Sequence, residues 1–208
     1  MALLPLVELI LTPRTDERTI ATAWAVATGL RKRGVLVRDA PAFVVNRVLT
    51  RMTTVLMAGL ERGSSVEETD ESVLRLGLPM APSVLLGMVG PRVANHVLET
   101  LHTAYPARFP LSATLANLAS GDGGIVVLKH APQSVEQLTT AVLEGLADEI
   151  RCLLEEGVVE SAANVDACLI LGAGFPLFLG GLTKHLDQTG VSQRVVGRPL
   201  AEIRAFAN

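Results

Sequence analysis

Two shortages set the first limits on what this 208-residue chain can do. Aromatic residues make up only 3% of the sequence and the formal net charge is -3. The chain therefore offers neither the stacking platforms nor the basic face that nucleic-acid binding requires. Its two cysteines, Cys152 and Cys168, are too few for a disulfide framework in so long a chain, which favours a reducing, cytoplasmic compartment. We expect each cysteine to fill core space on a helix.

Long apolar runs are also missing, although 49% of the residues are hydrophobic. The longest uncharged apolar stretch, residues 167–182, is too short for a membrane-spanning helix and contains Pro176. The apolar residues 1–11 have no basic leader and include Glu8, which argues against a secretion signal. The sequence therefore predicts a soluble protein without a membrane span.

Motifs for metals and nucleotides are weak. The four histidines, at positions 96, 102, 130 and 185, have no metal-binding spacing, and we expect no metal site. Residues 169–176, LILGAGFP, lack the third glycine and the strand-to-helix setting of a dinucleotide fingerprint. Residues 121–129, GDGGIVVLK, lack the Lys-Ser/Thr ending of a phosphate loop and are interpreted as a hinge.

The first forty residues predict a strand, a helix and a second strand. Residues 3–11 and 35–39 are apolar enough for buried strands, and Thr15 precedes a helix with acidic residues at its start. We expect residues 31–33, RKR, in the last turn of that helix and Gly34 at its end. Parallel strands usually belong to larger sheets, so residues 1–40 are interpreted as the end of a sheet whose other strands are absent.

The rest of the chain predicts helices. Pro41 suits the first turn of a helix that extends to about residue 62, and further helices are expected over 83–89, 91–105 and 111–119. Capping boxes at Ser65/Glu68 and Ser134/Gln137 begin two more, the second reaching Gly157 with Val142, Leu146, Ile150 and Leu153 on one face.

An internal repeat divides these helices. Residues 60–90 are similar to residues 154–190, so that Asp70 corresponds to Asp166 and Pro79 to Pro176. The expected fold class is mostly α, with two similar helical units after a strand-helix-strand segment. The expected domains are 1–40, 41–133 and 134–208.

Three polar residues interrupt apolar segments and are candidates for a site. Glu8 lies inside the first strand, where a carboxylate either faces water or has a partner, because an unpaired buried charge is unstable. Asn46 and Arg47 open a long apolar helix, whose free N–H groups attract carbonyl or phosphate groups. Asn46 is a weak helix former and Arg47 either faces water or contacts a ligand.

Several motifs, taken in order, resemble one family. They are PLVELI at 5–10, DAPAFVVNRVL at 39–49, GLPMAP at 77–82 and GAGFPLFLGGLTKHLDQTG at 172–190. Together they resemble the C-terminal region of the 3-hydroxyacyl-CoA dehydrogenases, and the doubled helical unit resembles the multifunctional α chain of fatty-acid β-oxidation. The resemblance identifies residues 1–40 as the remnant of an NAD-binding domain. Ala42 and Ala81 stand where the family has glycine.

The resemblance implies an NAD-dependent oxidoreductase that converts 3-hydroxyacyl-CoA into 3-ketoacyl-CoA. Glu8 matches the glutamate that pairs with the catalytic histidine, and Asn46 matches the asparagine that holds substrate and histidine. Asn46 and Arg47 are expected to bind the acyl-CoA. The family's histidine and glycine-rich loop would precede Met1, so we expect no NAD on this chain and no turnover by the chain alone.

Two alternatives stay open. The helical units are also suited to form a homo-oligomer or to dock a thiolase subunit, without catalysis of their own. A third possibility is an acyl-CoA-binding regulatory fragment. Light scattering tests the assembly module, because a monomer argues against it. The regulatory fragment would bind CoA thioesters with an affinity that Asn46→Ala abolishes.

Overall fold

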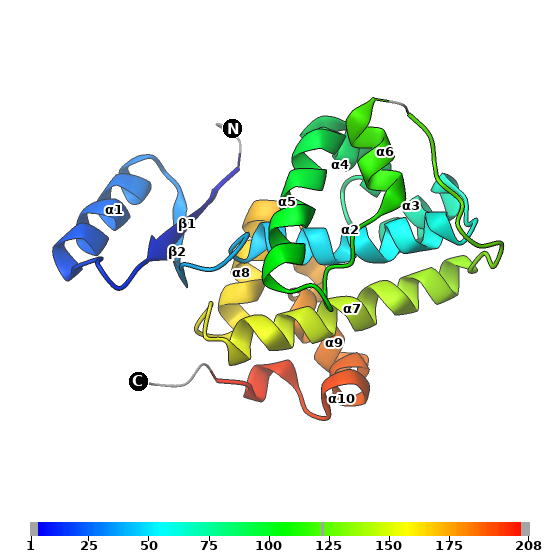
Figure 1. The fold of residues 1–208 in the computed structure, drawn as a ribbon. Helices are drawn as coiled ribbons and strands as arrows, with labels where there is room; N and C mark the ends of the chain where they lie inside the picture. The colour runs from blue at the N-terminus through cyan, green and yellow to red at the C-terminus, as the bar shows by residue number, and fades with distance from the viewer. Residues whose placement is uncertain (1–3, 122, 205–208) are drawn as a thin grey trace. The chain divides into compact units, whose positions relative to one another are not determined.

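A computed structural model describes residues 4–121 and 123–204 (Figure 1). The elements, in chain order, are β1 (Leu6–Leu11), α1 (Glu17–Gly29), β2 (Arg33–Arg38), α2 (Val45–Glu61), α3 (Val66–Leu74), α4 (Pro82–Val89), α5 (Pro91–Ala104), α6 (Ala113–Ser120), α7 (Val135–Glu155), α8 (Ala162–Ala173), the short helix η1 (Leu177–Leu179), α9 (Leu182–Gln188), α10 (Val191–Val196) and η2 (Leu200–Glu202). The expected fold class, mostly helical with a small parallel sheet, is confirmed.

Two compact units make up the chain. We call residues 1–45 with 150–208 the sheet unit, and residues 46–149 the helical unit. The three domains expected from the repeat, with boundaries near 40 and 133, stay a prediction. No helix in the described part of the chain combines the length and apolar character needed to cross a membrane.

The sheet unit contains the predicted strand-helix-strand segment. β1 and β2 pair in parallel from Leu6 opposite Arg33 to Leu11 opposite Arg38, and α1 connects them. Helix α8 packs against both strands. At Gly172 of α8 an added Cβ would lie 2.6 Å from a methyl group of Leu6, so glycine is what allows this close approach.

The predicted end of α1 is wrong. The helix ends at Gly29, and Arg31 adopts a left-handed φ of 56°. The last turn of α1 therefore contains none of the predicted basic residues. Arg33 and Gly34 belong instead to β2, because the parallel register requires Arg33 opposite Leu6. Gly34 has a packing role, since a Cβ there would lie 3.0 Å from a methyl group of Leu9 and 3.4 Å from the Trp24 ring.

Helix α2 begins later than predicted. Pro41 lies in a turn before the helix, and the first helical residue is Val45. Ala42 and Phe43 both have positive φ, 61° and 51°, which is unfavourable for residues with a Cβ. Glycine, which has no Cβ, would adopt this backbone conformation without strain.

In the helical unit, α2 and α7 approach closely where one of them has a glycine. A Cβ on Gly59 would lie 2.7 Å from Leu138, and one on Gly145 would lie 3.1 Å from Val55. The predicted apolar face of α7 is confirmed, since Val142, Leu146, Ile150 and Leu153 are all buried. Both capping boxes also form, at Ser65/Glu68 and at Ser134/Gln137.

The repeat is visible in one contact that occurs once in each unit. In the helical unit Asp70 accepts hydrogen bonds from the backbone N–H and hydroxyl of Ser83. In the sheet unit Asp166 accepts the same two bonds from Thr183, at 2.7 and 2.6 Å. The two aspartates that the sequence pairs therefore hold corresponding helices in the same way.

Both cysteines fill core space, as predicted. Cys152 on α7 and Cys168 on α8 are buried and form no disulfide. Burial, reinforced by the negative charge of Glu8, raises the pKa of the Cys168 thiol to about 12. A thiol with such a pKa has almost no thiolate at neutral pH, which makes it a packing residue and not a nucleophile.

Candidate functional site

Glu8 has a partner, which answers the question its sequence position raised. Its side chain extends from β1 to the turn before α2, where Oε1 accepts the backbone N–H of Val44 at 3.1 Å and of Val45 at 3.2 Å. These are donors at the start of a helix, where carboxylates are stabilised. Among the described residues, no hydrogen bond goes to the other carboxylate oxygen, Oε2.

Burial sets the protonation of Glu8. The carboxyl is half-buried on the strand, and desolvation raises its pKa, while the N–H groups of Val45 and Val44 act in the opposite direction. The net pKa is higher than that of a glutamate in water. Such a carboxylate keeps its proton more readily, and its negative charge is less shielded by solvent, so it interacts strongly with any cation or N–H donor beside it.

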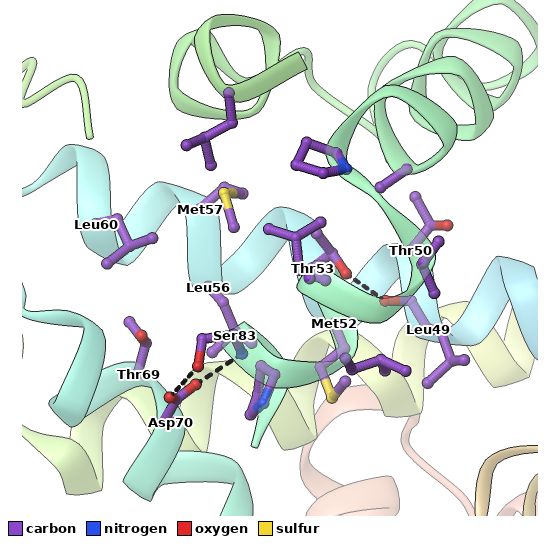
Figure 2. Close-up of a pocket in the computed structure, with 18 of the residues that line it drawn as sticks. Leu49, Thr50, Met52, Thr53, Leu56, Met57, Leu60, Thr69, Asp70 and Ser83 are labelled. Carbon is purple, nitrogen blue, oxygen red and sulfur yellow. Dashed lines mark hydrogen bonds between the residues drawn. The ribbon is translucent and has the colours of Figure 1, made fainter. Parts of the chain in front are cut away.

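Asn46 is the next residue after Val45 and lies in the first turn of α2. Its side chain is exposed, and it lines a cavity of about 420 Å³ in the helical unit. Other lining residues follow along one stripe of α2 at helical spacing, namely Leu49, Thr50, Thr53, Leu56, Met57 and Leu60 (Figure 2). Residues from α3, α4, α5 and α6 and Ile125 complete the wall.

Arg47 points away from that cavity and does not face water. Its side chain is fully buried, its Nε donates to Glu149 Oε1 at 2.5 Å, and its guanidinium lies 4.5 Å from the ring centre of Tyr105. Arg108 contacts the same two groups, at 3.3 Å from Glu149 Oε1 and 4.0 Å from the Tyr105 ring. Arg47 thus ties the first turn of α2 to α7 and to the end of α5.

The two glycine-rich segments do not form nucleotide loops. Residues 169–176 contain the end of α8, closed by Gly174 in a left-handed conformation, and not a strand-to-helix turn. Gly121 likewise closes α6. Beyond it, the Asn117 side chain donates to the carbonyl of Gly124, and the Thr114 hydroxyl accepts the backbone N–H of Val126. The two segments do not fit NAD as a binding loop, so neither is given a part in a reaction that uses this cofactor.

Sequence reasoning missed the cavity and the buried ion pair. The stripe from Asn46 through Thr53 to Leu60 follows helical spacing and was available as a signal. Glu149 gave no such signal, because it is 102 positions from Arg47. Tyr105, the single tyrosine of the chain, stacks on Arg47 in a way that no local pattern indicates.

Comparison with known proteins agrees with this geometry. Residues 43–120 match the sequence model of the family described as 3-hydroxyacyl-CoA dehydrogenase, C-terminal domain. The matched segment begins in the turn that Glu8 holds and includes α2 to α6. Over these residues the chain is similar to that domain family, which agrees with the resemblance found in its motifs.

Two curated relatives extend the match to most of the chain. A protein of Pseudomonas aeruginosa named fatty acid oxidation complex subunit alpha is 30% identical over 93% of this chain and 32% of its own length. A protein of Shewanella loihica with the same name is 29% identical over 92% of this chain and 31% of its own length. The chain therefore spans about a third of the length of the curated relatives it matches.

A solved structure shares the fold. The 3-hydroxybutyryl-CoA dehydrogenase of Escherichia coli K12 superposes with a TM-score of 0.71, over 97% of this chain and 66% of that chain. The sequence identity is only 16%, so the likeness establishes the architecture and not the chemistry.

Proposed function

We propose that this chain supplies the substrate side of an NAD-dependent 3-hydroxyacyl-CoA dehydrogenase, which oxidises 3-hydroxyacyl-CoA to 3-ketoacyl-CoA in fatty-acid degradation. The observation that carries the proposal is the pair of hydrogen bonds from Val44 and Val45 to Glu8. They fix the Glu8 carboxylate at the start of α2, where Asn46 follows Val45. Glu8 and Asn46 are the two residues that the family resemblance assigns to the reaction.

Glu8 is proposed to orient a histidine. Oε1 is occupied by the two backbone N–H groups, which leaves Oε2 to accept an imidazole N–H. A carboxylate in that position selects the tautomer whose other ring nitrogen takes the hydroxyl proton of the substrate, and it stabilises the imidazolium that forms. NAD would accept the hydride from carbon 3, and no described residue is assigned to hold it.

Asn46 is proposed to hold the substrate oxygen. Its exposed amide provides two N–H donors and one acceptor, enough to bind a thioester or 3-keto oxygen and the histidine together. Arg47 is proposed to contribute indirectly, because its buried bond to Glu149 fixes the first turn of α2 and with it the direction of Asn46.

The proposal is tested by titrating the purified chain with acetoacetyl-CoA in a calorimeter. Asn46→Ala removes the proposed contact and should weaken binding roughly tenfold, the effect of losing one good hydrogen bond. Asn95→Ala is the control, since Asn95 bonds Glu99 on α5 and is not among the cavity-lining residues. Equal affinity for the native chain and Asn46→Ala would contradict the proposal.

Assembly is the second candidate, and one observation favours it. Leu177 and Phe178 on η1 are 72% and 80% exposed, which is unusual for large apolar side chains. The curated relatives are named as subunits of a complex. These residues are therefore proposed to contact another subunit, either a second copy of this chain or a thiolase, in the cytoplasm.

The assembly proposal predicts a measurable change of mass. Light scattering should report an oligomer that Phe178→Ser dissociates, or a complex with a thiolase subunit that the same substitution prevents. Trp24→Ser, which removes an exposed aromatic side chain from α1, is the control and should leave the mass unchanged. A monomer that also fails to bind thiolase would exclude both partners.

A further inference from the structure

The sheet unit exposes three large aliphatic residues at one of its ends. Because β1 and β2 are parallel and α1 connects them, both strands begin at the end where α1 finishes. Leu4, just before β1, is 53% exposed, while Val26 on α1 and Leu30, its C-cap residue, are 57% and 65% exposed. Val26 and Leu30 are four positions apart and therefore share one side of the helix. More than half of each residue is accessible to solvent.

Three basic residues follow Leu30 directly. Arg31 and Arg33 are exposed, and neither has an ion-pair partner in the part of the chain that the structure describes. The Lys32 ammonium donates to the carbonyl of Leu4, which brings the charged loop to the start of β1. Aliphatic and basic side chains therefore lie at the same end of the sheet unit.

This positive charge is not balanced locally. The segments that meet there, residues 4–7 and 26–35, contain no aspartate and no glutamate. We call the surface formed by Leu4, Val26, Leu30 and residues 31–33 the basic end. It is positive although the chain as a whole has a formal net charge of -3.

Arg31 keeps its charge at a position where the backbone favours glycine. Its φ of 56° lies in the left-handed region, which is strained for a residue with a Cβ. Its guanidinium forms no hydrogen bond with any described residue, so no contact inside the fold explains why arginine stands there. Strained residues of this kind concentrate at functional surfaces, which points to a contact outside the chain.

We propose that the basic end binds the surface of an anionic lipid bilayer, as a peripheral contact without a membrane span. Val26 and Leu30 enter the boundary between headgroups and acyl chains, while the guanidiniums of Arg31 and Arg33 meet lipid phosphates. Because the rest of the chain is net negative, an anionic bilayer attracts this end and repels the remaining surface. The molecule is thereby oriented on the bilayer.

The small size of the apolar surface favours lipid over protein as the occupant. Three exposed aliphatic residues cover far less area than the roughly 800 Å² per partner that a stable protein interface buries. A bilayer needs no matched surface, because its headgroups rearrange around the side chains that enter it. It also offers anionic and apolar groups in adjacent layers, which suits Leu30 beside Arg31.

Sedimentation with lipid vesicles tests the proposal. The chain should bind vesicles that contain phosphatidylglycerol in phosphatidylcholine, and it should not bind vesicles of phosphatidylcholine alone. Arg31→Gly combined with Arg33→Gln should weaken partitioning roughly 25-fold, at about fivefold for each basic residue near the bilayer. Glycine suits the backbone at position 31, so this variant keeps the fold.

The matched control removes the same charge from the other end of α1. Arg14 and Arg18 are both exposed, and Arg18 lies roughly 20 Å along the helix from Arg31. Because salt screens charges beyond about 8 Å at physiological ionic strength, Arg14→Gln combined with Arg18→Gln should change partitioning less than about twofold.

A second pair of variants tests the apolar contact. Leu30→Ser should weaken partitioning about tenfold, because a leucine no longer leaves water. Leu111→Ser, at a 56% exposed site in the helical unit, should leave it unchanged. The fluorescence of Trp24 reports folding in every variant, since the ring lies beside Gly34 of β2.

Three results would overturn the proposal. The first is equal binding to neutral and anionic vesicles. The second is an equal loss in the two arginine pairs, because any positive charge would then serve. The third is binding to soluble poly-glutamate, unchanged by Leu30→Ser and without sedimentation on vesicles, which would assign the basic end to an acidic protein.

Discussion

Arg47 and Glu149 form an ion pair of 2.5 Å between two side chains that are both inaccessible to solvent. Removing one partner leaves the other as an uncompensated buried charge, so Glu149→Ala should lower the free energy of unfolding by about 3–5 kcal/mol. Replacing both, with Arg47→Met and Glu149→Leu, should cost clearly less. Urea unfolding measures each variant.

The control for this pair is an exposed one. Arg75 and Glu71 bond at 2.9 Å with about half of each side chain in solvent, and Arg75→Ala should lower the free energy of unfolding far less than Glu149→Ala does. If Glu149→Ala were no more destabilising than Arg75→Ala, the buried pair would not be the anchor of the first turn of α2.

Ala42 adopts a left-handed backbone conformation that glycine adopts without strain. Ala42→Gly should therefore raise the free energy of unfolding by about 1 kcal/mol, since the steric penalty of the Cβ at φ 61° is removed. Ala58→Gly, at an exposed site inside α2, should instead lower it by about 0.5–1 kcal/mol. A loss of stability in both variants would show that the turn before α2 is not strained.

The raised pKa of Glu8 predicts that the stability difference between the native chain and a Glu8→Gln variant depends on pH. Burial raises the pKa of Glu8 in the folded chain, so the protonated form favours folding at low pH, and this contribution is lost as pH rises through the folded pKa. Glu8→Gln keeps a carbonyl oxygen for Val44 and Val45 without the charge. The variant should therefore gain stability relative to the native chain between about pH 4 and pH 7. A difference that is constant or declines over that range would refute this explanation.

Cys168 should be unreactive in the folded chain. In a Cys152→Ala background it is the sole thiol, and its pKa of about 12 leaves almost no thiolate at neutral pH. A thiol reagent should label it only after unfolding, at a rate that follows denaturant concentration. Rapid labelling without denaturant would mean that α8 opens away from the strands.

Local patterns predicted the local structure well. The capping boxes at Ser65 and Ser134 and the buried face of α7 depend on residues a few positions apart, so they were readable in the sequence. The ends of α1 and α2 were not, because the first is fixed by pairing of β2 with β1 and the second by the carboxylate of Glu8. Both causes involve residues far apart in the sequence, and the periodicity of a single segment does not report such contacts.

The residues of the candidate site were likewise predictable from the sequence only in part. Glu8 and Asn46 could be selected from motifs, and the structure then supplied the Val44 and Val45 contacts of one and the cavity beside the other. Arg47 could be selected but its surroundings could not, since Glu149 and Tyr105 come from distant helices. An exposed arginine and a buried one have the same local sequence pattern on an apolar helix.

The most direct test of the proposed function is to locate acetoacetyl-CoA on the chain by NMR. Titration into the isotope-labelled chain should shift the backbone amide signals of Val45, Asn46 and Arg47 saturably, while CoA without the acyl group should shift them less. Saturable shifts there would place the reacting end of the substrate at the start of α2. Shifts confined to Leu177–Leu179 and its neighbours, or none, would contradict the account.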